Sequence, residues 1–97
     1  MIVEVSVVPI GTGETSVSSY VRAAVKIIEE TDLDYQVNSM GTCVQGEWDE
    51  IFSTLKAVHD ELAKMGCNRI VTTVKIDDRR DKFGSMDAKI SALEEGL

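Results

Sequence analysis

Six residues between positions 35 and 48 bring hydrogen-bonding and aromatic side chains into one short stretch of the chain. They are Tyr35, Asn38, Ser39, Thr42, Gln45 and Trp48. The four amide and hydroxyl side chains can donate and accept hydrogen bonds, and the two aromatic rings add flat apolar surface. This combination suits the binding of a small polar heteroaromatic molecule. The alternative is an ordinary half-exposed segment whose polar side chains face water.

The pattern around these residues predicts a β-hairpin that runs into a helix. Large side chains alternate with small or polar ones over 35–39 and again over 42–45, with Met40-Gly41 as the turn signal between the two runs. Gly46 ends the second run, and a helical apolar stripe follows. The members of that stripe are Trp48, Ile51, Phe52, Leu55, Val58, Leu62 and Met65, with Gly66 as the expected C-terminal cap. Polar side chains of the two adjacent strands can therefore converge.

The remaining periodicities complete a recognisable order of elements. Residues 2–9 form a β-branched run that ends at Pro9, and residues 69–77 alternate in the same way. Apolar residues recur at helical spacing over 17–30, and a short helical pattern follows Ser85. The order predicts an α+β fold of the ferredoxin-like β-α-β-β-α-β type, with two helices on one face of an antiparallel sheet and a short C-terminal helix.

Two helices cannot cover both faces of a four-stranded sheet, so one face should stay open. Alternation places Glu4, Ser6, Arg69, Val71, Thr73 and Lys75 on that face. We expect the open face to be wetted, to bind a ligand, or to close against another subunit. The apolar stripe of the C-terminal helix also needs a surface to rest on, in the same subunit or in a neighbour; its members are Met86, Ile90, Leu93 and Leu97.

Length and composition limit the functions that we consider. Ninety-seven residues predict a single domain over 1–97, and a net charge of −7 argues against a nucleic-acid partner. No apolar run is long enough to span a membrane, and the N-terminus begins as a strand, so we expect a cytoplasmic protein without membrane association. Cys43 and Cys67 form no close pair, which predicts reduced thiols.

Other chemical motifs are weak. Gly11-x-Gly13 before the hydroxyl residues Thr15 and Ser16 suggests a phosphate loop, but the dinucleotide fingerprint is incomplete, and the hydroxyls read as helix caps. His59 has no nearby partners for a nucleophilic triad or a zinc site. The mixed charges of 77–81 favour mutual neutralisation over a metal or phosphate site. We therefore expect neither catalysis nor a metal nor a required cofactor.

A series of short motifs, in their order and spacing, resembles the small ferredoxin-like proteins grouped as thiamine-binding proteins. The motifs are residues 9–13, 16–21, Tyr35 with 40–42, 46–48, and Arg69 with 77–81. The resemblance runs over almost the whole chain. It implies a homodimer or homotetramer built by pairing sheets, and binding of thiamine or its hydroxymethylpyrimidine portion without known catalysis.

Carried onto this chain, the resemblance gives each candidate residue a role. Asn38, Ser39, Thr42 and Gln45 would supply hydrogen bonds, while Tyr35 or Trp48 would stack on a ring. Gln45 stands where the family pattern often has an acid, and a glutamine can still pair with an aminopyrimidine edge, although without charge. The rival hypothesis is a structural or regulatory ferredoxin-like module that serves only oligomerisation or a protein partner.

Overall fold

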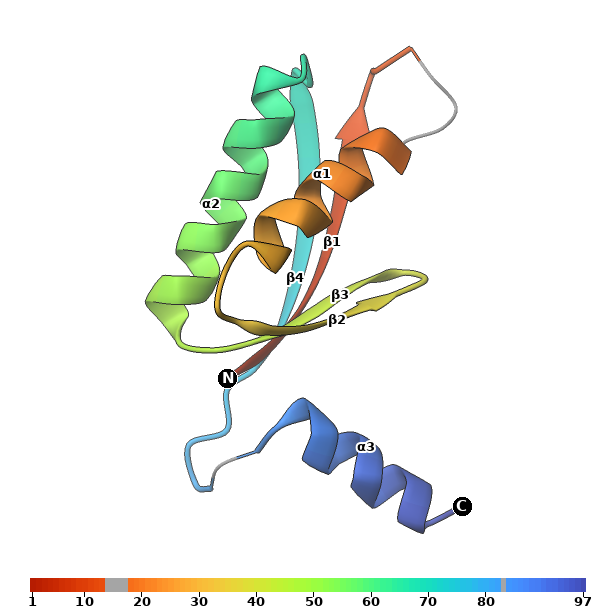
Figure 1. Ribbon diagram of the computed structural model, residues 1–97, viewed down its shortest axis with the longest axis vertical. Coiled ribbons are helices and arrows are strands. Elements are labelled where there is room, and N and C mark those ends of the chain that lie inside the picture. Colours follow the sequence, from red (N-terminus) through yellow and green to blue (C-terminus); the bar gives the residue numbers. More distant parts are fainter. Residues whose placement is uncertain (14–17, 83) are drawn as a thin grey trace.

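Four antiparallel strands form one sheet in the computed structural model, which describes residues 1–13, 18–82 and 84–97. The strands are β1 (Ile2–Ile10), β2 (Asp34–Asn38), β3 (Gly41–Gln45) and β4 (Arg69–Asp77), in the order β2-β3-β1-β4 across the sheet. Helices α1 (Ser18–Glu29) and α2 (Trp48–Lys64) cover one face, and α3 (Met86–Glu95) lies beyond the end of the sheet (Figure 1). The predicted ferredoxin-like fold is confirmed.

The core lies between the sheet and the first two helices. Its most deeply buried side chains are Val3, Val5, Val44, Ile28, Ile51, Val58 and Leu62. The strand residues among them share one face because side chains two apart in a strand point the same way. Burial of these β-branched and leucine side chains supplies the main stabilising force of the fold.

The apolar stripe of α2 was predicted too broadly. Trp48 and Phe52 remain 42% and 39% exposed, and their rings stack on each other with centroids 5.6 Å apart. Phe52 directly follows the buried Ile51, and successive helical residues are turned by about 100° around the helix axis. Phe52 therefore lies on the flank of the helix. Met65 is also exposed, and it follows the last helical residue as the C-terminal cap.

Strand β1 is longer than the hairpin strand beside it. Strand β3 pairs only with Ile2 to Val5, whereas β4 pairs with all nine residues of β1. The second half of β1 therefore has a neighbouring strand on one side only. Pro9 was expected to end the strand, but β1 continues to Ile10, because a proline is tolerated where one side of a strand has no partner.

The predicted helix ends lie at or next to those observed. The C-terminal cap of α2 is Met65, and Gly66, which was expected as the cap, follows it with φ of +97°, a conformation that favours glycine. The Ser85 hydroxyl accepts a hydrogen bond from the Ala88 amide at 3.1 Å and so caps α3. The caps predicted at Thr15 and Ser16, and the predicted first helical residue Val17, lie outside the described residues. Among those described, no helix is long and apolar enough to cross a membrane.

Candidate ligand-binding site

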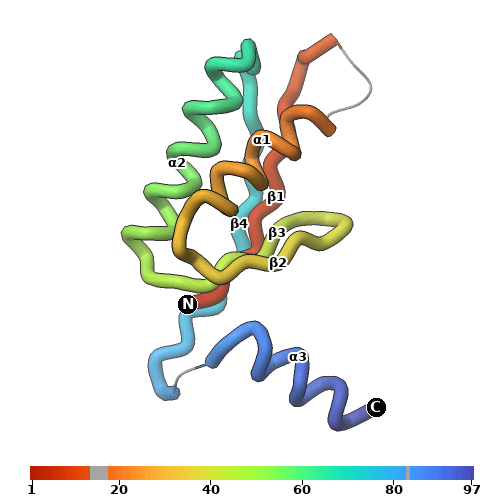
Figure 2. Tube along the Cα trace, viewed as in Figure 1, coloured from red at the N-terminus to blue at the C-terminus, as the bar shows by residue number. Residues whose placement is uncertain are grey.

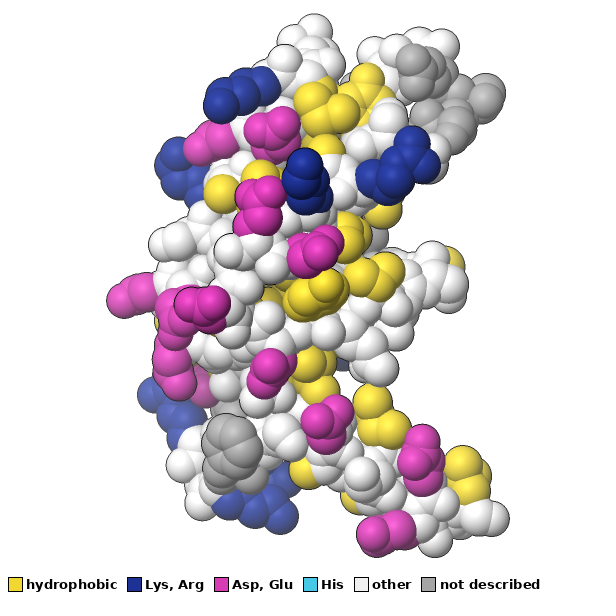
Figure 3. Space-filling view, in the orientation of Figure 1, with side chains coloured by type: hydrophobic (Ala, Val, Ile, Leu, Met, Phe, Trp, Pro, Cys, Tyr) yellow, Lys and Arg dark blue, Asp and Glu magenta, His cyan; other side chains and the backbone are white. Residues whose placement is uncertain are grey.

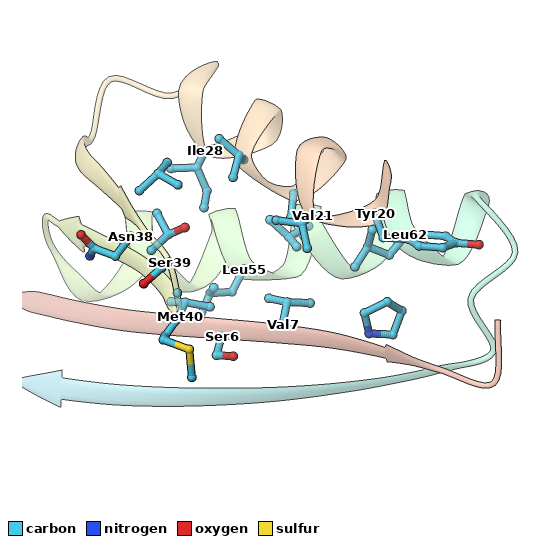
Figure 4. A pocket seen from close by; sticks show the side chains of 18 residues that line it. Ser6, Val7, Tyr20, Val21, Ile28, Asn38, Ser39, Met40, Leu55 and Leu62 are labelled. Carbon is cyan, nitrogen blue, oxygen red and sulfur yellow. The ribbon is translucent and has the colours of Figure 1, made fainter. Parts of the chain in front are cut away.

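A cavity of about 280 Å³ lies between α1, the sheet and the tip of the β2–β3 hairpin (Figure 4). It occupies the space beside the second half of β1, where no strand continues β3. Apolar side chains of α1 and α2 form much of its wall, among them Ala24, Ile28 and Leu62. The cavity thus follows from the unequal lengths of β1 and the hairpin.

Polar groups gather at the hairpin end of this cavity. Asn38 and Ser39 lie at the end of β2, Thr42 is buried in β3, and Ser6 lies on β1 just beyond the paired segment. In Figure 4 Asn38 and Ser39 lie at one end, and Tyr20 lies at the other. The cavity is therefore lined mainly by apolar side chains, with polar side chains at the end near the hairpin.

The tip of the hairpin approaches β1 very closely. A side chain at Gly41 would place its Cβ 2.8 Å from the carbonyl oxygen of Val5, closer than real Cβ atoms come to other heavy atoms. Glycine therefore allows the hairpin to lie against β1 and to bring Asn38 and Ser39 to the cavity. The Asn38 side-chain amide is oriented by a weak hydrogen bond to the Cys43 sulfur at 3.5 Å.

The described residues that line the cavity carry no charge. Charged side chains lie instead along an adjoining open groove on the outer side of α1, namely Arg22, Lys26, Glu29 and Glu30. The groove and the cavity share the side chains of Val21, Val25 and Val37. A neutral group is thus suited to the cavity, because a charge would lose its hydration there without a partner. A charged group is suited to the groove.

The six residues predicted from the sequence divide into two sets. Asn38, Ser39 and Thr42 line the cavity, and Tyr35, Gln45 and Trp48 do not. Trp48 begins α2 and stacks on Phe52, while the Tyr35 ring lies 38% exposed on the edge strand β2.

Gln45 has a different contact. Its side-chain oxygen accepts a hydrogen bond from the Met86 amide at 2.9 Å, at the start of α3. Gln45 therefore connects the sheet to the C-terminal helix, and the assignment of all six residues to a ligand stays a prediction.

Some cavity residues were not proposed as site residues. Tyr20 was assigned to the packing face of its helix and Ser6 to the open face of the sheet, yet both contribute to the lining. Met40, part of the predicted turn, also borders the cavity. The unequal strand lengths were the available signal for this part of the cavity. Strand β1 has nine residues and each hairpin strand has five, so part of β1 has no hairpin strand beside it.

The weaker motifs remain apart from the cavity. His59 Nε2 lies 2.6 Å from Thr72 Oγ1, a hydrogen bond that joins α2 to β4. No group of three or more potential metal ligands occurs in the described parts of the chain.

The charged segment after β4 forms local ion pairs. Arg79 pairs with Asp81 and Arg80 with Asp78, and the hydrogen bond from Arg79 lowers the pKa of the Asp81 carboxyl. Both arginines and Asp81 are largely exposed, and Asp78 is partly exposed, so such pairs add little to stability. The charges therefore neutralise one another locally.

Fold and cavity together define a small ferredoxin-like α+β protein with a partly open cavity of about 280 Å³. Residues 3–94 match the family model described as thiamine-binding protein, and the chain belongs to this family. A relative described as a UPF0045 protein from Methanothermobacter thermautotrophicus is 40% identical over 97% of this chain and 96% of its own. The UPF0045 protein YqgV of Bacillus subtilis is 37% identical over 99% of this chain and 96% of its own.

Solved structures agree with the fold. A hypothetical protein from Methanocaldococcus jannaschii has a TM-score of 0.86 at 37% identity, covering 97% of this chain and 95% of its own. A Thermotoga maritima protein described as a putative thiamine biosynthesis/salvage protein has a TM-score of 0.82 at 24% identity, covering 95% and 96%. The latter similarity bears on the fold alone.

Proposed function

We propose that this protein binds thiamine or a related aminopyrimidine without transforming it, and acts as a carrier, buffer or sensor in the form of a homo-oligomer. The observation that carries the proposal is the neutral cavity of about 280 Å³ with its polar groups at one end. Membership of the thiamine-binding family suggests the class of ligand.

The cavity suits the pyrimidine portion of the ligand. An aminopyrimidine is neutral, has two apolar ring faces, and carries ring-nitrogen acceptors beside an amino donor on its edge. Asn38, Ser39 and Thr42 offer matching donors and acceptors where they line the cavity. The volume is near the lower end of the range for ligand pockets, roughly 300 Å³, which favours one ring over two.

The thiazolium portion of thiamine would then lie outside, along the groove on α1. Its positive charge is favoured near Glu29 and Glu30, and the net charge of −7 adds a general attraction for a cation. Arg22 and Lys26 border the same groove and could pair with a phosphate on the same ligand.

A binding role is suggested by the family, which is described as thiamine-binding. The hydroxyl groups of the lining can donate and accept hydrogen bonds to a ligand; they belong to Ser6, Tyr20, Ser39 and Thr42. The homo-oligomer is supported by the open face of the sheet, where Val8 and Val71 are 43% and 44% exposed side by side.

Calorimetric titration with thiamine, thiamine phosphates and hydroxymethylpyrimidine tests the proposal. We expect saturable binding at one site per subunit, weakened about tenfold or more by Thr42→Val because a buried polar contact worth about 1–3 kcal/mol is lost. Gln36→Ala is the matched control, since Gln36 is exposed on β2 and does not line the cavity. If the folded protein gave no heat of binding with any of these ligands, the proposal would be contradicted. The result would favour the rival hypothesis of a module that serves only oligomerisation or a protein partner.

A further inference from the structure

Trp48 and Phe52, here called the aromatic pair, form a flat apolar surface on the flank of α2. Their rings are nearly parallel, with an interplanar angle of 9° and centroids 5.6 Å apart, and they are 42% and 39% exposed. The buried side of the helix is supplied by other residues, among them Ile51, Leu55 and Val58. Neither ring lines the cavity or the groove on α1. The aromatic pair therefore adds apolar surface outside both the core and the ligand site.

Carboxylates gather beside this surface. Figure 3 shows acidic side chains at the left of the view, over the start of α2. Three exposed acids flank Trp48 in the chain and are here called the acidic rim, namely Glu47, Asp49 and Glu50. The N-terminal end of a helix favours acids, but its dipole is equivalent to only about half a positive charge. Three carboxylates exceed that charge, so the acidic rim can still attract a cation.

The cations at this end of the molecule already have partners. Ile2 pairs with Gln45 on one side and with Asp77 on the other, so the start of α2 and the end of β4 lie at one end of the sheet, near the N-terminus (Figure 2). The cations that follow β4 pair with other acids: Arg79 with Asp81, Arg80 with Asp78 and Lys89 with Asp77. The ion pairs within residues 1–13, 18–82 and 84–97 do not include the acidic rim. The rim thus presents its negative charge to a partner.

Aromatic rings beside carboxylates suit an arginine side chain. A guanidinium group is planar and always charged, stacks on aromatic faces, and donates hydrogen bonds to carboxylates. The surface is not part of a concave site, and small molecules bind mainly in concave sites. Tryptophan and arginine are among the residues that contribute most to protein–protein interfaces. The arginine is therefore best supplied by a segment of a protein.

We propose that the aromatic pair and the acidic rim form a docking surface for a segment of another protein that carries arginines next to apolar residues. The rings pack against the apolar side chains and the guanidinium planes, and the carboxylates pair with the guanidinium N–H groups. This inference goes beyond the proposed function and does not depend on the identity of the ligand. It gives a carrier or sensor a place to meet a second protein, separate from the cavity.

Trp48 is the only tryptophan in the sequence, so tryptophan fluorescence reports directly on this surface. The probe is a blocked five-residue peptide that alternates arginine with leucine, and its control has glutamate in place of arginine. We expect a saturable change in fluorescence with the arginine peptide alone, and weaker binding at high salt because salt screens exposed charges. An unchanged spectrum with the arginine peptide, or equal binding of the glutamate peptide, would overturn the proposal.

Calorimetry with the arginine peptide tests the acidic rim. Asp49→Asn combined with Glu50→Gln should weaken binding at least tenfold. The matched control is Glu94→Gln combined with Glu95→Gln, which removes the same charge from the last turn of α3 and should leave the affinity unchanged. Equal weakening by both pairs would mean that only net charge matters, and this result would overturn the proposal.

Phe52→Ala tests the aromatic pair and should also weaken binding at least tenfold, while circular dichroism checks that the variant is folded. Met65→Ala, 38% exposed at the other end of α2, is the matched control and should bind normally. Because Phe52 does not line the cavity, Phe52→Ala should still give heat with thiamine, so failure of docking and failure of ligand binding are distinguishable. If Trp48 fluorescence changed with protein concentration alone, a second copy would occupy the surface, which would overturn the proposal.

Discussion

Gly41 determines how close the tip of the hairpin comes to β1. A Cβ there would lie 2.8 Å from the Val5 carbonyl oxygen, a backbone atom that cannot move alone. Gly41→Ala should therefore shift the hairpin, lower the free energy of unfolding by about 1–3 kcal/mol and weaken binding of the pyrimidine. Chemical denaturation and calorimetry measure the two effects.

The control for this change is Gly84→Ala, because a Cβ at Gly84 would have no heavy atom within 4 Å. It should alter neither stability nor binding. If Gly41→Ala also left both unchanged, the hairpin would not be held against β1 as described, and the polar end of the cavity would be formed differently.

At the scale of elements, the hydrogen bond between Gln45 and α3 allows a test of whether Gln45 has a structural role or binds the ligand. Removing the side-chain oxygen in Gln45→Ala leaves the Met86 amide without its partner. Hydrogen exchange of the first turn of α3 should become faster, while the affinity for thiamine should not change because Gln45 does not line the cavity. If the variant bound thiamine more weakly while hydrogen exchange of α3 stayed unchanged, Gln45 would belong to the ligand site.

The ion pair between Asp77 and Lys89 makes the position of α3 dependent on pH. The hydrogen bond and charge of Lys89 lower the pKa of Asp77 below its ordinary value of 3.8. The stabilising contribution is therefore fully present above that value and is lost as the pH falls through the lower, folded pKa. Amide chemical shifts of α3 should move in this acidic range, and Lys89→Met should remove the movement.

At the scale of the whole molecule, adjacent residues of α2 provide a test of the core. Ile51 is 1% exposed and Phe52 is 39% exposed. Ile51→Ala should lower the free energy of unfolding by about 2–5 kcal/mol, because it removes buried atoms and leaves a cavity. Phe52→Ala, the larger truncation, should cost less. Urea denaturation of both variants checks the order, and the reverse order would place Phe52 in the core.

Sequence patterns predicted the elements well and the contacts of individual side chains less well. Alternation and helical spacing place every strand and helix of the described chain within a residue or two, because these periods follow from backbone geometry. The same spacing assigned Phe52 to the core, since periodicity gives the direction of a side chain only approximately. Packing against the sheet decides which residues at the margin of a stripe become buried.

The sequence by itself determined the ferredoxin-like topology and the family, because both depend on the order of elements and on short motifs along the chain. It also indicated the hairpin that contributes Asn38, Ser39 and Thr42 to the cavity. Only the tertiary structure decided that Gln45 contacts α3 and that Trp48 stacks on Phe52. The physical reason is that the cavity arises from strand register and the close approach at Gly41, which join residues distant in the chain.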